Sequence, residues 1–182
     1  MTIPNLITSL RIILVPIFVI YILNDEFLPA MVIFGLAGLS DGADGLIARV
    51  FEQKSRLGSF LDPLADKMLL VAGFIVLSVR ELVPSWLTVL VISRDAFILL
   101  GVMVLFLQKM DLTIRPSVVS KITTCFQLTS LFIVLLNREV SFSARYCEVV
   151  FYITGFLTIA SGLHYMHYWF RMIGEGTSED QD

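Results

Sequence analysis

Six apolar runs, each close to the length of a membrane-spanning helix, follow one another along this chain with short polar breaks between them. A helix needs roughly 20 predominantly apolar residues to cross the hydrocarbon of a bilayer. The residues are 57% hydrophobic and 16% charged, which is too apolar for an ordinary soluble domain. We therefore expect an all-α fold, an integral membrane bundle of six transmembrane helices over about residues 5–23, 29–49, 58–79, 84–107, 117–136 and 146–170.

The chain has no polar linker long enough to separate two domains. We expect one membrane domain over residues 1–173 and a disordered acidic tail, GEGTSEDQD, over residues 174–182. Cys125 and Cys147 lie in or beside apolar runs without metal-ligand spacing, so we expect both to be reduced packing residues.

The distribution of lysine and arginine predicts the orientation, because cytoplasmic loops carry an excess of these residues. The far side of the predicted bundle holds only Arg80, Arg138 and Arg145. The side of the two termini is much more basic and holds Arg11, Arg49, Lys54, Arg56, Lys109, Arg115, Lys121 and Arg171. We therefore expect a multi-pass protein of the cytoplasmic membrane with both termini in the cytoplasm.

Four aspartates lie within or beside the second and third apolar runs: Asp41, Asp44, Asp62 and Asp66. A carboxylate at membrane depth costs several kcal/mol unless it is paired or binds a cation. Helical spacing places Asp41 and Asp44 near one another on the second span, and Asp62 and Asp66 lie one turn apart on the third. Two adjacent antiparallel helices would present these four carboxylates to one cavity near the cytoplasmic face.

An all-oxygen site of high negative charge suits a hard divalent cation, Mg²⁺ or Mn²⁺, and four carboxylates are enough for two such ions. Two ions would clamp a pyrophosphate and stabilise both the attacking and the leaving oxygen. Gly42, Gly45, Ala48 and Gly58 remove bulk beside the carboxylates, so that a nucleobase and a sugar fit against the helix backbones. An internal salt-bridge network is the alternative use of the aspartates.

The same residues resemble the signature of the CDP-alcohol phosphotransferase family, D-x2-D-G-x2-A-R-x8-G-x3-D-x3-D. Its eight fixed positions are matched at every spacing by Asp41, Asp44, Gly45, Ala48, Arg49, Gly58, Asp62 and Asp66. The resemblance implies a two-metal site, a CDP-linked donor and release of CMP. It also implies that family members form homodimers.

The resemblance further implies a role for each matched residue. Asp41, Asp44 and Asp62 would be metal ligands, and Asp66 would complete the metal site and act as the general base for the acceptor hydroxyl. Cytidine would pack near Gly45, Ala48 and Gly58, and we place the motif's Arg49 in the same substrate site.

Outside the motif, the chain resembles the phosphatidyltransferases that use CDP-diacylglycerol, most nearly those that make cardiolipin. The shared features are the opening IPNLITSLRIILVP, the ISRD run that ends at Arg94 and Asp95, the Ser120-Lys121 pair and the end HYMHYW. We expect phosphatidylglycerol as the acceptor. The alternative is synthesis of phosphatidylglycerol phosphate from glycerol 3-phosphate, although those enzymes tend to carry an R-E pair and a second arginine that this chain lacks.

Several polar residues outside the motif have two interpretations each. Arg94 would bind a lipid phosphate or form an ion pair within the bundle. Arg115 and Lys121 would touch substrate phosphate or reach the membrane surface. Asn5 and Thr8 would line the donor headgroup or simply begin a helix at the surface. Lys67 would neutralise the aspartates or reach the interface, and His164 and His167 would belong to an interfacial aromatic belt rather than to a metal site.

Two other functional classes place carboxylates in a membrane. A transporter or channel would usually show repeats or broken helices, whereas the aspartates here cluster at one face. A structural membrane protein explains the hydrophobicity and leaves the motif spacing unexplained. We expect lipid substrates and no nucleic-acid partner.

Overall fold

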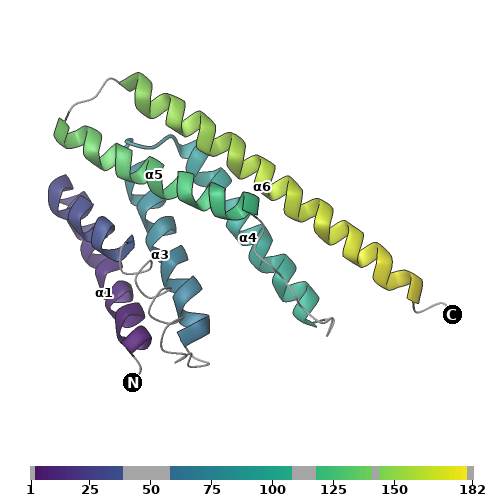
Figure 1. Cartoon of the computed structure of the whole chain (residues 1–182). Coiled ribbons are helices and arrows are strands. Elements are labelled where there is room, and N and C mark those ends of the chain that lie inside the picture. The colour runs from purple at the N-terminus through teal and green to yellow at the C-terminus, as the bar shows by residue number, and fades with distance from the viewer. Residues whose placement is uncertain (1–2, 39–57, 108–117, 141–143, 180–182) are drawn as a thin grey trace.

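Every element in the described part of the chain is a helix (Figure 1). The computed structural model describes the backbone of residues 3–38, 58–107, 118–140 and 144–179, and side chains within residues 11–38, 67–103, 118–140 and 145–169. The helices are α1 (Ile3–Leu23), a helical segment Phe27–Gly38, α3 (Gly58–Val79), α4 (Ser85–Leu107), α5 (Val118–Val140) and α6 (Ala144–Glu179). The all-α prediction is therefore confirmed for these residues.

The helix bounds follow the apolar runs closely. The third run was expected over 58–79, and α3 spans Gly58–Val79. The greatest difference is at the end of the chain, where α6 continues to Glu179, past the point at which we expected disorder. Extending a formed helix adds one hydrogen bond per residue without a new nucleation step, so a helix can run on into polar sequence.

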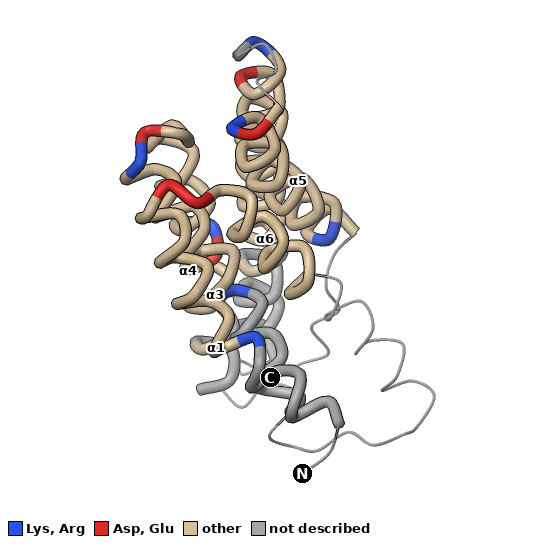
Figure 2. Tube along the Cα trace, turned by 90° about the vertical axis from the view of Figure 1, so that its left-hand side faces the viewer, with Lys and Arg blue, Asp and Glu red and all other residues tan. Residues whose placement is uncertain are grey.

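Two of the described helices are long and apolar enough to cross a membrane, α5 over Val118–Val140 and α6 over Arg145–His167. Shorter apolar helical stretches cover Arg11–Leu23, Phe27–Gly38 and Lys67–Val79. Long uncharged stretches separate the charged residues along the helices (Figure 2). The described residues alone do not contain six membrane-spanning helices, so the six-span bundle stays a prediction.

Successive helices alternate in direction, so that the chain runs up and down through the bundle (Figure 1). Helix α3 packs against α1, α4 and α5, and α6 packs against both α4 and α5. The turns at Asn24 and Arg80 meet at one end of the bundle, where Arg80 forms an ion pair with Asp25. At the same end, the Arg138 guanidinium carbon lies 5.0 Å from the centre of the Phe27 ring.

Two of the helices end in the same backbone motif. After α1, Asp25 adopts a left-handed φ of 63°, and the Glu26 amide donates to the Tyr21 carbonyl at 2.9 Å. After α3, Glu81 adopts a φ of 59°, and the Leu82 amide donates to the Leu77 carbonyl at 2.9 Å. These six-to-one bonds are those of a Schellman cap, which satisfies carbonyls at the end of a helix.

The centre of the bundle is apolar between α1, α3, α4 and α5. Its fully buried side chains include Phe18, Ile22, Phe74, Leu77, Leu87, Leu131 and Leu135. Large apolar side chains also lie exposed on the outer faces of every described helix, for example Ile13, Leu36, Ile75, Phe97, Phe132 and Phe156. So much exposed apolar surface is unfavourable for a monomeric protein in water and is compatible with a lipid environment.

The contact between α5 and α6 is polar instead. Gln127 on α5 donates to the Thr158 hydroxyl at 3.2 Å, and the Thr123 hydroxyl donates to the Leu157 carbonyl at 3.1 Å. Both side chains of α5 are completely buried. Interhelical hydrogen bonds of this kind fix the register of two helices where lipid provides no hydrophobic driving force between them.

Candidate functional site

The residues of the aspartate motif fall at the border of the described structure. Asp41, Asp44, Gly45, Ala48 and Arg49 lie outside the described residues. Gly58, Asp62 and Asp66 lie on the first three turns of α3, where the structure describes the backbone and not the side chains. The predicted helix through these three positions is therefore present, and the meeting of the four carboxylates remains a prediction.

The other predicted site residues are distributed over three helices. Asn5 and Thr8 lie on α1, where the structure describes the backbone at these positions and not the side chains. Arg115 lies outside the described residues. Lys121 lies on the first turn of α5 and is exposed. Arg94 lies in the middle of α4 and is buried. Of the predicted substrate residues, Arg94 is thus the one whose surroundings the structure gives in detail.

Arg94 is the centre of a polar network that joins all three helices packed near it. Its Nη1 donates to Asp95 Oδ1 at 2.7 Å, and its Nη2 donates to the hydroxyls of Ser120 at 2.6 Å and Ser161 at 2.7 Å. Its guanidinium carbon lies 5.9 Å from the centre of the Tyr165 ring, within the range of a cation–π contact. The ion pair within the bundle, one of the two expectations for Arg94, is therefore present.

The network also reaches the helix of the aspartate motif. Lys67, the residue after Asp66 on α3, donates from Nζ to Asp95 Oδ2 at 2.6 Å. One carboxylate thus faces two cations, Lys67 and Arg94, and the sum of +2 and −1 leaves a net charge of +1. The Arg94 and Asp95 side chains are only 4% and 7% exposed. The buried pair Arg94–Asp95 is therefore neutral, and the additional positive charge lies on Lys67, whose side chain is 36% exposed.

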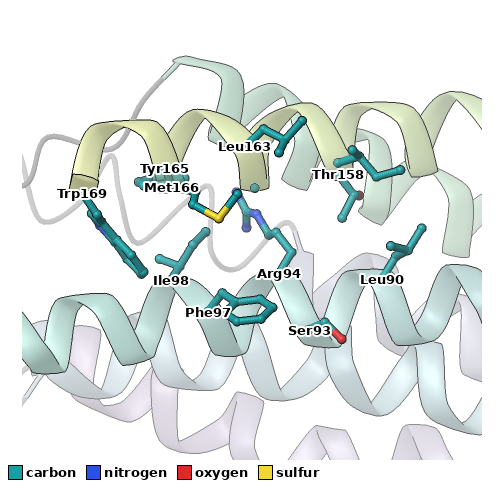
Figure 3. Close-up of a pocket in the computed structure, with 12 residues that line it drawn as sticks. Leu90, Ser93, Arg94, Phe97, Ile98, Thr158, Leu163, Tyr165, Met166 and Trp169 are labelled. Carbon is teal, nitrogen blue, oxygen red and sulfur yellow. The ribbon is translucent and has the colours of Figure 1, made fainter. Parts of the chain in front are cut away.

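A pocket of about 440 Å³ opens between α4 and α6, with Arg94 in its lining (Figure 3). The other lining residues are Leu90, Ser93, Phe97, Ile98, Thr158, Ile159, Gly162, Leu163, Tyr165, Met166 and Trp169. The Arg94 Nε is buried and has no hydrogen-bond partner in the part of the chain that the structure describes. The pocket walls are therefore almost entirely apolar, and the one unused donor of Arg94 is itself buried and not open to the pocket.

No group of three or more His, Cys, Asp or Glu side chains gathers into a metal site among the described residues. The side chains of the four motif aspartates lie outside the described residues. His164 and His167, on the exposed face of α6, both lie at the solvent- or lipid-accessible surface.

Asp95, Ser161 and Tyr165 complete the Arg94 network. The sequence assigned no role to Asp95 or Ser161, and it placed Tyr165 in the interfacial aromatic belt, whereas the Tyr165 side chain is buried beside Arg94. A signal was present for two of them. Ser161 and Tyr165 lie four residues apart on one face of an otherwise apolar helix, and polar residues in such a helix usually face a partner.

Comparison with known proteins gives matches over most of the chain. Residues 1–161 match the family described as CDP-alcohol phosphatidyltransferase. The cardiolipin synthase (CMP-forming) of Rattus norvegicus is 35% identical and that of Homo sapiens 33%, each over 92% of this chain and 61% of the relative. The CDP-diacylglycerol--glycerol-3-phosphate 3-phosphatidyltransferase of Bacillus subtilis (strain 168) is 33% identical over 89% of this chain and 92% of its own length. The chain thus spans about three fifths of the two synthases, 61% of each.

Proposed function

The chain belongs to the CDP-alcohol phosphatidyltransferase family, and on that premise we propose that it transfers the phosphatidyl group of CDP-diacylglycerol to a hydroxyl of phosphatidylglycerol. The products are cardiolipin and CMP. The relatives in rat and human named cardiolipin synthase (CMP-forming) support this assignment. The observation that carries it is Arg94, a buried cation beside an apolar pocket, whose Nε has no hydrogen-bond partner among the described residues.

In the proposed setting, the chain is a bundle of six transmembrane helices in the cytoplasmic membrane, with its active site on the cytoplasmic side, and it acts as a homodimer. The exposed apolar side chains on every described helix support the membrane setting. The excess of lysine and arginine on the side of the termini supports the orientation.

The donor site is assigned to the aspartate motif. Its carboxylates suit Mg²⁺ or Mn²⁺ in charge and in ligand type, and the helical backbone of α3 supports the one-turn spacing of Asp62 and Asp66. Two divalent cations held there would supply charge neutralisation for the diphosphate and for the leaving CMP. The proposed ligands are Asp41, Asp44, Asp62 and Asp66.

The remaining motif residues and the basic residues near them bind the substrates. Gly45, Ala48 and Gly58 leave room for cytidine, with Arg49 beside them. Asn5 and Thr8 lie near the donor headgroup, and Arg115 and Lys121 contact phosphate. In the overall reaction, the acceptor hydroxyl oxygen forms a bond to the phosphatidyl phosphorus, the bond from that phosphorus to CMP breaks, and the hydroxyl proton passes to Asp66.

The charge of the acceptor favours phosphatidylglycerol. Its phosphodiester carries a single negative charge, equal in size to the net +1 of the network of Arg94, Asp95 and Lys67, in which Arg94 is the member that lines the pocket. Glycerol 3-phosphate carries close to two charges and would need several convergent cations. Among the described side chains, the pocket is lined by one cation, Arg94, and otherwise by apolar and uncharged residues.

A second candidate function is supported by the relatives that this chain covers almost completely. The proteins of Bacillus subtilis and Aquifex aeolicus named CDP-diacylglycerol--glycerol-3-phosphate 3-phosphatidyltransferase are 33% and 32% identical, over 92% and 98% of their own lengths. The alternative is therefore synthesis of phosphatidylglycerol phosphate with glycerol 3-phosphate as the acceptor.

A panel of acceptors separates the two. Purified protein receives CDP-diacylglycerol, Mg²⁺ or Mn²⁺, and either phosphatidylglycerol or glycerol 3-phosphate, and both CMP and the lipid product are identified by mass. We expect phosphatidylglycerol to stimulate CMP release with formation of cardiolipin, and Arg94→Ala to abolish the stimulation. Stimulation by glycerol 3-phosphate alone, without cardiolipin, would establish the second candidate instead.

A further inference from the structure

A second pocket lies at the end of the bundle where the turns after α1 and α3 meet, and its volume is about 230 Å³. Among the described residues, four charged ones line it, Asp25, Arg80, Glu81 and Arg138, together with three apolar ones. Figure 2 shows acidic and basic residues gathered at this end of the bundle. The distribution of lysine and arginine predicts that the same end faces away from the cytoplasm. We call this pocket the turn pocket.

Two of the four charges in the turn pocket are already paired with each other. Arg80, in the turn after α3, forms an ion pair with Asp25 in the turn after α1. The Glu81 carboxylate and the Arg138 guanidinium form no ion pair with another side chain in the described part of the chain. The lining therefore presents one unpaired negative group and one unpaired positive group.

The unpaired cation is held in place by an aromatic ring. The Arg138 guanidinium carbon lies 5.0 Å from the centre of the Phe27 ring, and Phe27, also in the lining, is buried. A guanidinium over the face of a ring keeps its N–H edge free, and that edge can bind a phosphate through two parallel hydrogen bonds. Arg138 is thus positioned as a phosphate-binding group in the last turn of α5.

The unpaired anion occupies a backbone position that is unfavourable for it. Glu81 has a φ of 59°, which glycine adopts freely and which is costly for a residue with a Cβ. Asp25, with a φ of 63°, lies in the same lining. Residues in such conformations cluster at ligand sites, where a required side chain outweighs the backbone cost. A glutamate at position 81 is accounted for if its carboxylate binds a group that the chain itself does not supply.

The two unpaired charges limit the kind of ligand. A metal ion would pair with Glu81 but would also face the two arginines of the lining. An inorganic anion would pair with Arg138 and place a second negative charge beside Glu81. A ligand that carries one phosphate and one cationic group pairs with both side chains and adds no net charge to the pocket.

A phospholipid with a phosphoethanolamine headgroup carries these two groups in a fixed order, the phosphate next to the glycerol and the ammonium farther from the hydrocarbon. Arg138 on a helix and Glu81 in the turn beyond a helix have the same order. Val79, which is 69% exposed in the lining, offers an apolar contact on the hydrocarbon side. A primary ammonium also donates hydrogen bonds to a carboxylate, which the quaternary ammonium of choline cannot do. The volume is below the roughly 300–1,000 Å³ of pockets for whole drug-sized ligands, and it suits a headgroup.

We propose that the turn pocket binds the phosphoethanolamine headgroup of a phospholipid in the leaflet opposite the cytoplasm, with Arg138 on the phosphate and Glu81 on the ammonium. The bound headgroup links the turn after α3 to the end of α5. The 22 residues of α3, roughly 33 Å at 1.5 Å of helix rise per residue, separate this pocket from Gly58 at the start of the motif helix. The inference uses the membrane setting of the proposed function and does not use its reaction.

Native mass spectrometry of the full-length protein in detergent can measure the dissociation constants of phosphatidylethanolamine and phosphatidylcholine with identical acyl chains. Neither lipid is a substrate of the proposed reaction. We expect phosphatidylethanolamine to bind roughly two- to fivefold more tightly, as for a single exposed charged contact. Glu81→Gln should remove this preference and leave the affinity for phosphatidylcholine unchanged. Arg138→Gln should weaken the binding of both lipids.

The matched controls are Glu139→Gln and Arg145→Gln, which remove the same charges from exposed positions at the same end of the bundle, outside the lining. Both should keep the parent affinities. Thermal unfolding in mixed micelles is a second readout, because a ligand that binds the folded state raises the Tm by mass action. Phosphatidylethanolamine should raise the Tm of the parent and of Glu139→Gln more than phosphatidylcholine does, and this difference should be absent in Glu81→Gln.

Equal affinity of the parent protein for the two lipids would overturn the proposed site. An equal loss of preference in Glu81→Gln and Glu139→Gln would overturn it too, because the effect would then come from net charge alone. Free phosphoethanolamine that binds as tightly as the lipid would show that the ligand is soluble and would overturn the assignment to a membrane lipid. These measurements contain no CDP-diacylglycerol, so failure of the turn pocket leaves the proposed reaction standing, and the absence of cardiolipin synthesis leaves the turn pocket standing.

Discussion

At the scale of single residues, the most unusual group is a carboxylate that is shared between two cations. Asp95 accepts hydrogen bonds from Arg94 at 2.7 Å and from Lys67 at 2.6 Å, and it is almost fully buried. The pair Arg94–Asp95 lies within α4, whereas Lys67 belongs to α3, so one side chain links the helix of the aspartate motif to the proposed acceptor site. The Asp95 carboxylate thus balances positive charge and also connects α3 to α4.

Removing this carboxylate should be strongly destabilising. Asp95→Ala leaves the Arg94 guanidinium buried without its counter-charge, and breaking a buried ion pair in this way costs about 3–5 kcal/mol. Arg80→Ala is the matched control, because it breaks the exposed ion pair with Asp25, for which we expect about 1 kcal/mol or less. Thermal unfolding in detergent measures both. Equal losses in the two variants would show that burial of the Asp95 pair is not stabilising.

Replacing different aspartates of the motif should remove different functions, metal binding for Asp62 and proton transfer for Asp66. Asp62→Asn takes away a charged metal ligand and should abolish both activity and metal-dependent nucleotide binding. Asp66→Asn should also abolish turnover, yet keep much of the donor binding, because its distinctive role is to accept the proton of the acceptor hydroxyl. The measurements are CMP release and binding of CDP in the presence of Mg²⁺. Substantial turnover by Asp66→Asn at saturating metal would refute the assignment of the base.

At the scale of elements, the ends of α1 and α3 show how a sequence without glycine closes a helix. Both Schellman caps place a residue in the left-handed region, Asp25 after α1 and Glu81 after α3. Aspartate tolerates this conformation better than most residues, whereas glutamate has no such advantage. The cap at Glu81 is therefore the more strained of the two.

Glu81→Gly should raise the stability of the protein. The left-handed conformation costs a residue with a Cβ about 1–2 kcal/mol, and the added chain entropy of glycine offsets part of this gain. The expected net gain is up to about 1 kcal/mol, measured as an increase in Tm in detergent. The control is Ser78→Gly in the last turn of α3, where glycine should lower the Tm. A decrease in both variants would contradict a strained cap.

At the scale of the whole molecule, the alternation of helix directions places the turns at Asn24 and Arg80 at one end and the start of α3 at the other (Figure 1). The first turn of α5 lies beside the middle of α4, where Ser120 accepts a hydrogen bond from Arg94. The ion pair between Arg80 and Asp25 ties two successive turns together at the first end. The basic residues predict that the end with the start of α3 faces the cytoplasm. Substrates that dissolve in the cytoplasm would then reach the motif helices from that end.

Cysteine labelling tests this orientation. With Cys125 and Cys147 replaced by serine and alanine, Glu81→Cys should react with a membrane-impermeant maleimide in right-side-out vesicles, and Lys121→Cys in inside-out vesicles. Both parent side chains are exposed. Detergent-solubilised protein, in which both positions should react, is the control for accessibility. Labelling of both from the same side would refute the alternating arrangement across a membrane.

The helices of this protein follow from the sequence by itself, because a run of about 20 apolar residues selects a helix by local composition and length. The bounds of α3 at Gly58 and Val79 needed no knowledge of neighbouring helices. The motif is likewise recognised from the spacing of its residues along the sequence. That its four carboxylates lie close together stays a prediction, since their side chains lie outside the described residues.

The surroundings of Arg94, by contrast, were decided only by the tertiary structure. Its partners Ser120 and Ser161 are 26 and 67 residues away in the sequence, and Asp95 reaches Lys67 across 28 residues. A buried guanidinium needs hydrogen-bond or ion-pair partners, and the sequence alone does not show which residues these are. Which side chains meet it depends on how α4 packs against α5 and α6. The same packing creates the pocket between α4 and α6, because a space between two helices is a property of neither helix alone.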